Sequence, residues 1–123
     1  ARFFAGDLGR ALRENPTLQR EYPFSLLVDA SRFYPDALPG EKILLQGVID
    51  GWFETEEGLT LFDFKTDRVP PYAAQDRAQR YQGQLAAYAY ALETLTQKPV
   101  VHRLLWFLHP GVGIDLAGEN EKN

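Results

Sequence analysis

The sequence predicts an α/β domain in which a mixed β-sheet, built from a hairpin and a crossover strand, is flanked by helices. Two strand-like segments, residues 42–55 and 59–66, surround a short acidic turn, which is the pattern of a β-hairpin. The longest helical pattern, residues 73–96, follows them and leads to an apolar segment, residues 100–108. Because a strand that returns through a helix can pair in parallel with the hairpin, the predicted sheet is mixed.

The N-terminal part adds one helix and one further strand. Residues 3–14 carry apolar side chains at helical spacing until an Asn-Pro pair stops the pattern. Residues 21–30 (EYPFSLLVDA) are rich in strand-forming residues, and the proline near their start favours an edge position. Residues 35–40 (PDALPG) then predict a turn or loop.

Length and composition indicate a single globular domain. The chain has 123 residues, of which 45% are hydrophobic and 24% charged. We expect one domain at residues 1–116 and a polar, frayed tail at residues 117–123. The sequence begins with alanine and lacks methionine, which suggests a piece of a longer chain. It contains neither a signal peptide nor the roughly 20 apolar residues that a membrane span needs, so we expect a cytoplasmic protein.

Composition also limits the chemistry. The chain has no cysteine, so any metal would be held mainly by oxygen atoms or by the two histidines, which favours magnesium, manganese or calcium. The net charge of -4 gives no support to nucleic-acid binding, although acidic residues at a metal site would contribute to that charge.

The two hairpin strands each carry an aspartate among apolar neighbours. Asp63 and Lys65 share one face of the second strand, while Phe62 and Phe64 point to the other face, toward the predicted core. If the turn consists of residues 56 and 57, Asp50 lies opposite Asp63. A turn at residues 57 and 58 places it opposite Lys65, and a three-residue turn places it on the other face unless a bulge compensates.

Neighbouring carboxylates suggest a metal site. Two carboxylates roughly 5 Å apart repel each other, and a cation between them reverses that effect. Magnesium is commonly held by one or two carboxylates with water and phosphate oxygens, and Lys65 beside it could orient a water and stabilise charge on a phosphate. From spacing alone, a solvated hairpin face with an ordinary ion pair explains Asp50, Asp63 and Lys65 equally well.

The long helix presents a second group of polar residues. Tyr81, Gln84 and Tyr88 fall at spacings of three and four, so they share one helical face. The tyrosines are readily explained as packing residues with hydroxyls satisfied at the rim. A glutamine on an otherwise apolar stripe needs partners, and we expect Gln84 to reach the metal site or the nucleotide backbone.

Three motifs in order, GVID at 47–50, DFKTD at 63–67 and YQGQLAAYAYAL at 81–92, resemble the PD-(D/E)XK nuclease superfamily. More narrowly, the chain resembles the RecB-type nuclease domain at the C-terminal end of AddA (RexA) helicase-nuclease subunits, and REYPF at 20–24 resembles the segment before the hairpin in those subunits. The resemblance covers residues 3–108. It implies a restriction-endonuclease-like core, and it carries the family's catalytic positions to Asp50, Asp63, Lys65 and Gln84, with Tyr88 completing the helical motif.

The resemblance implies a magnesium-dependent deoxyribonuclease of the exonuclease type, with manganese as a possible substitute. Asp50, Asp63 and the backbone carbonyl of Phe64 would hold the metal. A further acidic or histidine ligand would come from an upstream helix. Glu14 lies at the far end of residues 3–14, so we expect that upstream helix to lie outside this sequence.

The resemblance also implies partners. The substrate would be DNA, mainly single-stranded, delivered by helicase domains of the same full-length chain, where ATP would act. A second subunit of the AddB/RexB type would complete an enzyme for double-strand-break end processing and recombinational repair.

Other polar residues have less specific roles. Arg68 and Arg80, with Arg77 between them, could meet DNA phosphates, although a solvated helical face explains them as well. His102 and His109 belong to an apolar strand region and are interpreted as structural. Glu21 could point toward the site, or pair with Arg20 or Lys42.

Two other functions remain open at this point. The chain could be a catalytically silent, nuclease-like module that binds DNA or docks subunits. A carboxylate metal site could also serve a small-molecule phosphate ester.

Overall fold

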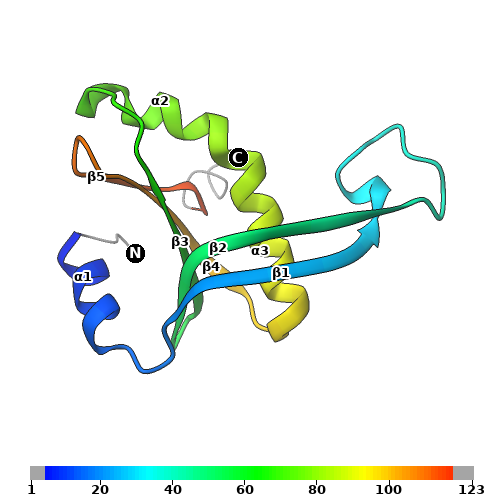
Figure 1. Cartoon of the computed structure of the whole chain (residues 1–123), viewed down its shortest axis with the longest axis horizontal. Coiled ribbons are helices and arrows are strands. Elements are labelled where there is room, and N and C mark those ends of the chain that lie inside the picture. Colours follow the sequence, from blue (N-terminus) through cyan, green and yellow to red (C-terminus); the bar gives the residue numbers. More distant parts are fainter. Residues whose placement is uncertain (1–4, 118–123) are drawn as a thin grey trace.

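The computed structural model describes residues 5–117, with side chains from residue 8 onward. It contains a five-stranded sheet in which the strands follow one another in the order β1-β2-β3-β4-β5 (Figure 1). The pair β3–β4 is parallel and the other three pairs are antiparallel, so the sheet is mixed as predicted. The strands are β1 Gln19–Asp29, β2 Lys42–Thr55, β3 Gly58–Lys65, β4 Val100–Phe107 and β5 Val112–Asp115. The sequence analysis missed β5, a strand of four residues.

The hairpin between β2 and β3 closes through a two-residue turn. Thr55 pairs with Gly58, and the register continues to Gly51 opposite Phe62, which is the first of the three predicted registers. Gly58 has a φ of +144°, and a Cβ there would lie 2.6 Å from the Pro99 carbonyl oxygen. The turn therefore requires glycine both for its backbone angle and for the close approach of the chain that leads into β4.

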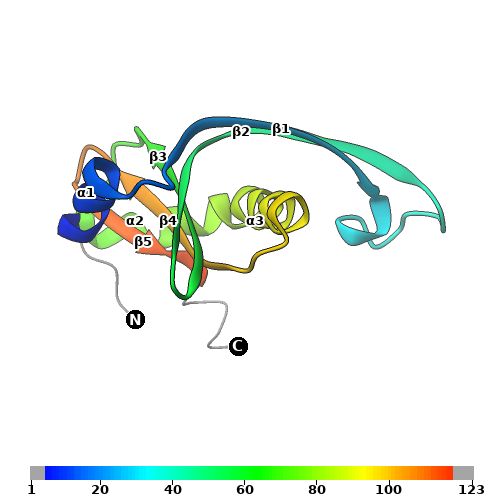
Figure 2. The same cartoon turned by 90° about the horizontal axis from the view of Figure 1, so that it is seen from below.

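The strands β1 and β2 continue beyond the sheet as a long two-stranded arm. Their pairing extends to Asp29 opposite Lys42, whereas β2 pairs with β3 only from Gly51 to Thr55. The arm bends away from β3 and passes over α3 (Figures 1 and 2). Near the start of β1, the exposed residue Glu21 has a φ of +50°, and its register position faces Asp50. A non-glycine residue in this left-handed region is uncommon and marks a local strain in the strand.

The region predicted as one long helix, residues 73–96, is interrupted in the structure and is preceded by a short 3₁₀ turn. A 3₁₀ turn, η2 (Pro71–Ala73), leads into α2 (Ala74–Ala78); a second, η3 (Gln79–Tyr81), separates α2 from α3 (Gln82–Thr96). The prediction of a continuous helix was wrong at η3. There, Tyr81 has a φ of −102° and a ψ of 1°, outside the helical range.

Helices cover both faces of the sheet. On one face, α3 packs its buried Leu85 and Leu92 against Leu61 of β3 and the inner side of the arm. On the other face, α1 (Ala5–Glu14) packs Leu8 against Phe62. The sequence analysis assigned the core to the Phe62 side alone. The structure corrects this, because Asp63 and Lys65 lie on the α3 side, among buried neighbours.

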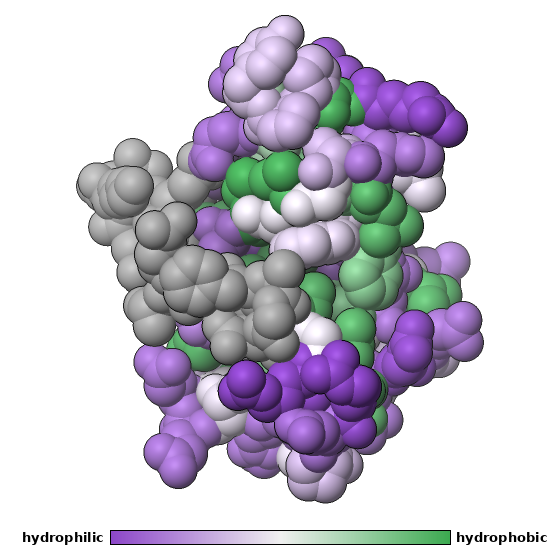
Figure 3. Space-filling model, turned by 90° about the vertical axis from the view of Figure 1, so that its left-hand side faces the viewer, coloured by the Kyte–Doolittle hydropathy of each residue, from purple (hydrophilic) through white to green (hydrophobic). Residues whose placement is uncertain are grey.

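Seen from the side of α1 and β5, the surface mixes hydrophilic and hydrophobic residues (Figure 3). None of the helices between residues 5 and 117 combines the length and the apolar character that crossing a bilayer requires. Phe3 and Phe4, which the predicted first helix included, and residues 118–123 of the predicted tail lie outside the described residues.

Candidate active site

The candidate site lies where the arm separates from the sheet. The residue of β2 beyond the last pair with β3 is Asp50, and in the same register it faces Asp63. Its carboxylate accepts a hydrogen bond of 2.7 Å from the backbone N–H of Phe64. This N–H lies past the end of the β2–β3 ladder, so the side chain of Asp50 satisfies a donor that the strand no longer pairs.

The carboxyl group of Asp63 is almost completely enclosed, with 5% of the residue exposed. Burial raises its pKa from 3.8 to about 6, the neighbouring Asp50 adds to that rise, and Lys65 opposes it. The Lys65 ammonium lies 2.7 Å from a carboxylate oxygen of Asp63. The positive charge of Lys65 thus does not fully balance the negative charge of the two aspartates. A further cation would stabilise this site.

Lys65 links the strand to the helix. Its ammonium donates to the side-chain oxygen of Gln84 over 2.8 Å, and the Gln84 amide donates to the Tyr88 hydroxyl over 3.1 Å. The structure therefore brings together Asp50, Asp63, Lys65, Gln84 and Tyr88, which the sequence analysis named as candidate site residues, and their roles stay a prediction. Contrary to that analysis, Gln84 is exposed rather than part of a buried stripe.

The Tyr88 side chain is held on its other side by the arm. Its ring meets Phe24 edge to face at a centroid distance of 5.7 Å, and a Cβ on Gly47 would lie 3.2 Å from the ring. Burial raises the pKa of Tyr88, and the negative charge of Asp63 adds to the rise, so the hydroxyl remains protonated. Tyr88 thus connects the hydrogen-bond chain from Lys65 to the packing of the arm.

A second group of contacts surrounds Lys65 from the side of the loop after β3. The Tyr81 ring lies beneath the ammonium, with 4.2 Å between the Lys65 nitrogen and the ring centroid. The Tyr81 hydroxyl donates to Asp67, and Arg77 forms an ion pair with the same carboxylate at 2.9 Å. The sequence analysis left Asp67 without a role, although its position in DFKTD, on the polar chain segment directly after Lys65, was the signal that could have identified it.

The arginines, histidines and Lys42 that the sequence analysis considered differ in their exposure and in their partners. Arg68 and Arg80 are exposed, whereas Arg77 is engaged by Asp67, so the three arginines are not equivalent as possible phosphate contacts. His102 contacts Asp115 over 2.6 Å and His109 is exposed. Lys42 forms its ion pair with Asp29 rather than with Glu21.

The oxygen donors at the site fit a magnesium-type ion. Asp50 and Asp63 supply carboxylates, and the uncompensated negative charge between them suits a divalent cation. The Phe64 carbonyl lies in the same segment of β3. Among the side chains described for residues 8–117, no group of three or more His, Cys, Asp or Glu residues could hold a metal. Water and phosphate oxygens would complete the coordination, which is the usual arrangement for magnesium.

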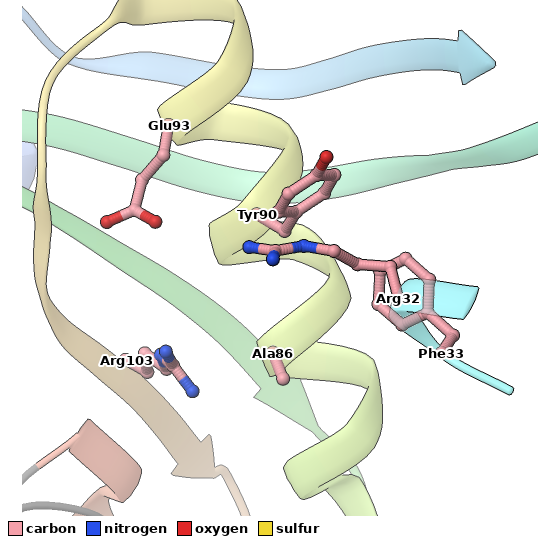
Figure 4. Close-up of a pocket in the computed structure, with 6 residues that line it drawn as sticks. All are labelled: Arg32, Phe33, Ala86, Tyr90, Glu93 and Arg103. Carbon is pink, nitrogen blue, oxygen red and sulfur yellow. The ribbon is translucent and has the colours of Figure 1, made fainter. Parts of the chain in front are cut away.

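A separate pocket of about 230 Å³ lies on the other flank of α3 (Figure 4). Arg32 and Phe33 from the far end of the arm meet Tyr90 of α3 there, and Arg103 of β4 lines the opposite wall. None of the acidic residues of the candidate site lines this pocket.

Comparisons with known proteins identify the family. The model of the PD-(D/E)XK nuclease superfamily matches residues 1–122. An ATP-dependent helicase/nuclease subunit from Lacticaseibacillus casei is 49% identical over 120 residues, which is 94% of this chain and 10% of that relative. Relatives with the same description from Pelotomaculum thermopropionicum (40% identical, 93% of this chain, 9% of the relative) and Desulforudis audaxviator (42%, 90% and 9%) also match.

The chain thus spans about a tenth of the length of these curated relatives. Its mixed sheet with helices on both faces agrees with the restriction-endonuclease-like α/β fold. On the match over residues 1–122, this chain belongs to the PD-(D/E)XK nuclease superfamily.

Proposed function

We propose that the chain is a magnesium-dependent deoxyribonuclease domain that hydrolyses phosphodiester bonds in single-stranded DNA. The observation that carries this proposal is the meeting of Asp50, Asp63, Lys65 and Gln84 at one point, where β2, β3 and α3 adjoin. The superfamily supports the nuclease chemistry. Metal dependence rests on the two carboxylates and on their incompletely balanced charge.

Each residue has a distinct task in hydrolysis. Asp50 and Asp63 would hold the cation, with the Phe64 carbonyl as a third donor, and a bound magnesium ion would supply Lewis-acid polarisation of the phosphodiester. Lys65 donates hydrogen bonds that orient the attacking water and stabilise negative charge on the phosphate in the transition state. Water adds to phosphorus as a P–O bond breaks, and the products are one phosphate end and one hydroxyl end.

Gln84 and Tyr88 act on this arrangement from the helix. Gln84 accepts one of the three hydrogen bonds that the Lys65 ammonium can donate, and Tyr88 fixes the orientation of the Gln84 amide. The exposed side of Gln84 leaves room for contact with the nucleotide backbone, and the exposed Arg68 and Arg80 are suited to phosphate groups farther along the strand.

The wider role is part of the same proposal, and the names of the relatives support its helicase-nuclease part. Their description as ATP-dependent helicase/nuclease subunits supports a domain that receives single strands from helicase domains of the same polypeptide, where ATP is used. We further propose that a second subunit of the AddB/RexB type is the partner. The biological process would be end processing and recombinational repair of double-strand breaks, and the exonuclease mode belongs to the same proposal.

The rival function is a catalytically silent module that binds DNA or docks subunits. It is favoured by one observation, namely that side chains 8–117 supply only two carboxylates to the site. The two proposals differ in one measurable property, which is cleavage that depends on Lys65.

The test is cleavage of labelled single-stranded DNA with magnesium or manganese. It compares this chain with a form extended about 40 residues upstream, a length that allows one helix and a loop. Each form is paired with its Lys65→Ala variant and with Lys98→Ala, which removes an exposed lysine bound to Glu54. We expect cleavage that Lys65→Ala abolishes and Lys98→Ala leaves unchanged. Folded, metal-loaded protein without lysine-dependent cleavage in either form would establish the silent module instead.

A further inference from the structure

The Lys65 ammonium is enclosed on three sides. Asp63 lies at 2.7 Å, Gln84 at 2.8 Å, and the Tyr81 ring face at 4.2 Å from the ring centroid. A cation over an aromatic face is attracted by the ring's quadrupole, and more strongly when water is excluded. Because only 16% of the Lys65 side chain is exposed, the ring is a substantial part of the surface that confines the ammonium.

The Tyr81 ring is itself fixed by contacts at its outer end. Its hydroxyl lies 2.8 Å and 2.9 Å from the two Asp67 oxygens, and Arg77 binds the same carboxylate at 2.9 Å. Burial alone would raise the pKa of Asp67, but the hydrogen bonds from Arg77 and Tyr81 outweigh it and hold that pKa below its ordinary value. Asp67 is therefore a charged anchor for the ring near neutral pH.

The backbone at Tyr81 departs from a helix where these contacts form. Tyr81 ends the 3₁₀ turn η3, with a φ of −102° and a ψ of 1°, between two α-helical segments. A 3₁₀ turn inside a helical region commonly marks a functional position or a strained sequence. Asp67 follows Lys65 by two residues. Tyr81 therefore contacts both ends of this short segment, Lys65 through its ring face and Asp67 through its hydroxyl.

We propose that Tyr81, anchored by Asp67 and Arg77, is a positioning residue that holds the Lys65 ammonium in place for the nuclease reaction. Tyr81 acts through Lys65, and the proposal rests on the proposed function in that Lys65 assists hydrolysis. It goes beyond a packing role because the ring face meets the charged end of the lysine and not only its apolar stem.

The first test needs no activity. In the NMR spectrum of the folded chain, the ε-methylene protons of Lys65 should lie upfield of those of the exposed Lys42 and Lys98, because they are near the face of an aromatic ring. The signal is assigned by its loss in Lys65→Ala. Tyr81→Leu should remove the upfield displacement and Tyr81→Phe should keep most of it. A wild-type Lys65 signal at the position of the exposed lysines would overturn the proposal, whether or not any variant folds.

Kinetics of metal-dependent cleavage form the second test. Tyr81→Leu should lower kcat about tenfold with KM changed less than about twofold, and Tyr81→Phe or Asp67→Asn should lower kcat about two- to threefold. The matched control is Tyr90→Leu, which removes a half-buried tyrosine of α3 on the pocket side (Figure 4) and should leave kcat unchanged. An effect of Tyr90→Leu as large as that of Tyr81→Leu would indicate general loosening and refute a specific role.

The third test separates positioning from structure. If Tyr81 acts through Lys65, the double variant Lys65→Ala/Tyr81→Leu should have the same kcat as Lys65→Ala alone. Both values are measured as residual cleavage at high protein concentration. An equal tenfold loss in both backgrounds would show a role independent of the lysine. If Lys65→Ala retains full activity, the proposed function of the lysine fails, while the NMR signal still reports whether the ring holds the ammonium.

Discussion

The ionised carboxyl group of Asp63 should destabilise the metal-free protein near neutral pH. The Asp63→Asn variant should therefore have a higher free energy of unfolding than the wild type. The pKa of Asp63 is raised from 3.8 to about 6, which means that the native state resists its ionisation. A tenfold change in an acid dissociation constant corresponds to about 1.4 kcal/mol. The rise in pKa therefore limits the destabilisation by ionised Asp63 to at most about 3 kcal/mol. Water that reaches the half-buried Asp50 beside it reduces this destabilisation. We expect Asp63→Asn to raise the free energy of unfolding by about 1 to 3 kcal/mol above pH 6.

The sign of the pH dependence follows from proton binding. Between pH 4 and pH 6 the native state holds the Asp63 proton while the unfolded chain has released it, so this group's contribution to stability falls as pH rises through that window. Asparagine does not titrate. The difference in free energy of unfolding between Asp63→Asn and the wild type should therefore be near zero at pH 4 and reach its full positive value above pH 6.

Urea unfolding in EDTA, followed by the fluorescence of Trp52 and Trp106, measures this difference from pH 4 to pH 8. Asp29→Asn is the control, because Asp29 is an exposed carboxylate of the arm and its removal should give a small difference. If Asp63→Asn is no more stable than the wild type at pH 8, or if the difference does not change with pH, the reasoning from burial is refuted. Added magnesium should stabilise the wild type and not Asp63→Asn, since only the native wild type binds the ion.

Three further predictions concern the frame of the site. Gly51→Ala should cost about 1 to 3 kcal/mol in urea unfolding, because the new Cβ would lie 2.1 Å from the ring of the fully buried Phe62; a variant as stable as the wild type would contradict that packing. Leu92→Ala should cost about 2 to 5 kcal/mol by leaving a cavity under α3, which thermal unfolding would detect. Asp67→Asn should be less stable than the wild type above pH 4, because folding lowers the pKa of Asp67 and so favours its charged form. The difference in free energy of unfolding should shrink as pH falls below the ordinary carboxyl pKa. A difference that does not change with pH would refute this prediction.

The hairpin was predictable from local patterns, whereas the candidate site residues were selected by resemblance to the nuclease family, because spacing alone allowed an ordinary ion pair equally well. Strand alternation placed Asp63 and Lys65 on one face, and the turn at residues 56 and 57 was one of the three registers that the sequence allowed. Helical spacing placed Gln84 and Tyr88 on one flank, where Gln84 accepts a hydrogen bond from Lys65 and donates one to Tyr88. Each of these inferences depends only on periodicity within one element or on the length of one turn.

The parts that escaped prediction depend on contacts between distant segments. β5 has only four residues, directly after the turn that contains Pro110 and Gly111, so its pattern is too short to recognise. The helix breaks at Tyr81, where contacts with Lys65 and Asp67 accompany a backbone that no helical periodicity anticipates. The position of Asp67 in DFKTD could have marked it as a candidate, but its contacts with Tyr81 and Arg77 depend on segments that are distant in the sequence.

The shape of β2 gives the two aspartates different mechanical supports. Asp63 lies on β3 beyond its last pair with β2 and is paired with Leu105 of β4, whereas Asp50 sits at the root of the arm, where β2 has left β3 and continues beside β1. The two carboxylates thus lie side by side just past the end of the β2–β3 ladder, where the hydrogen bond from the Phe64 N–H to Asp50 continues the link between the two strands.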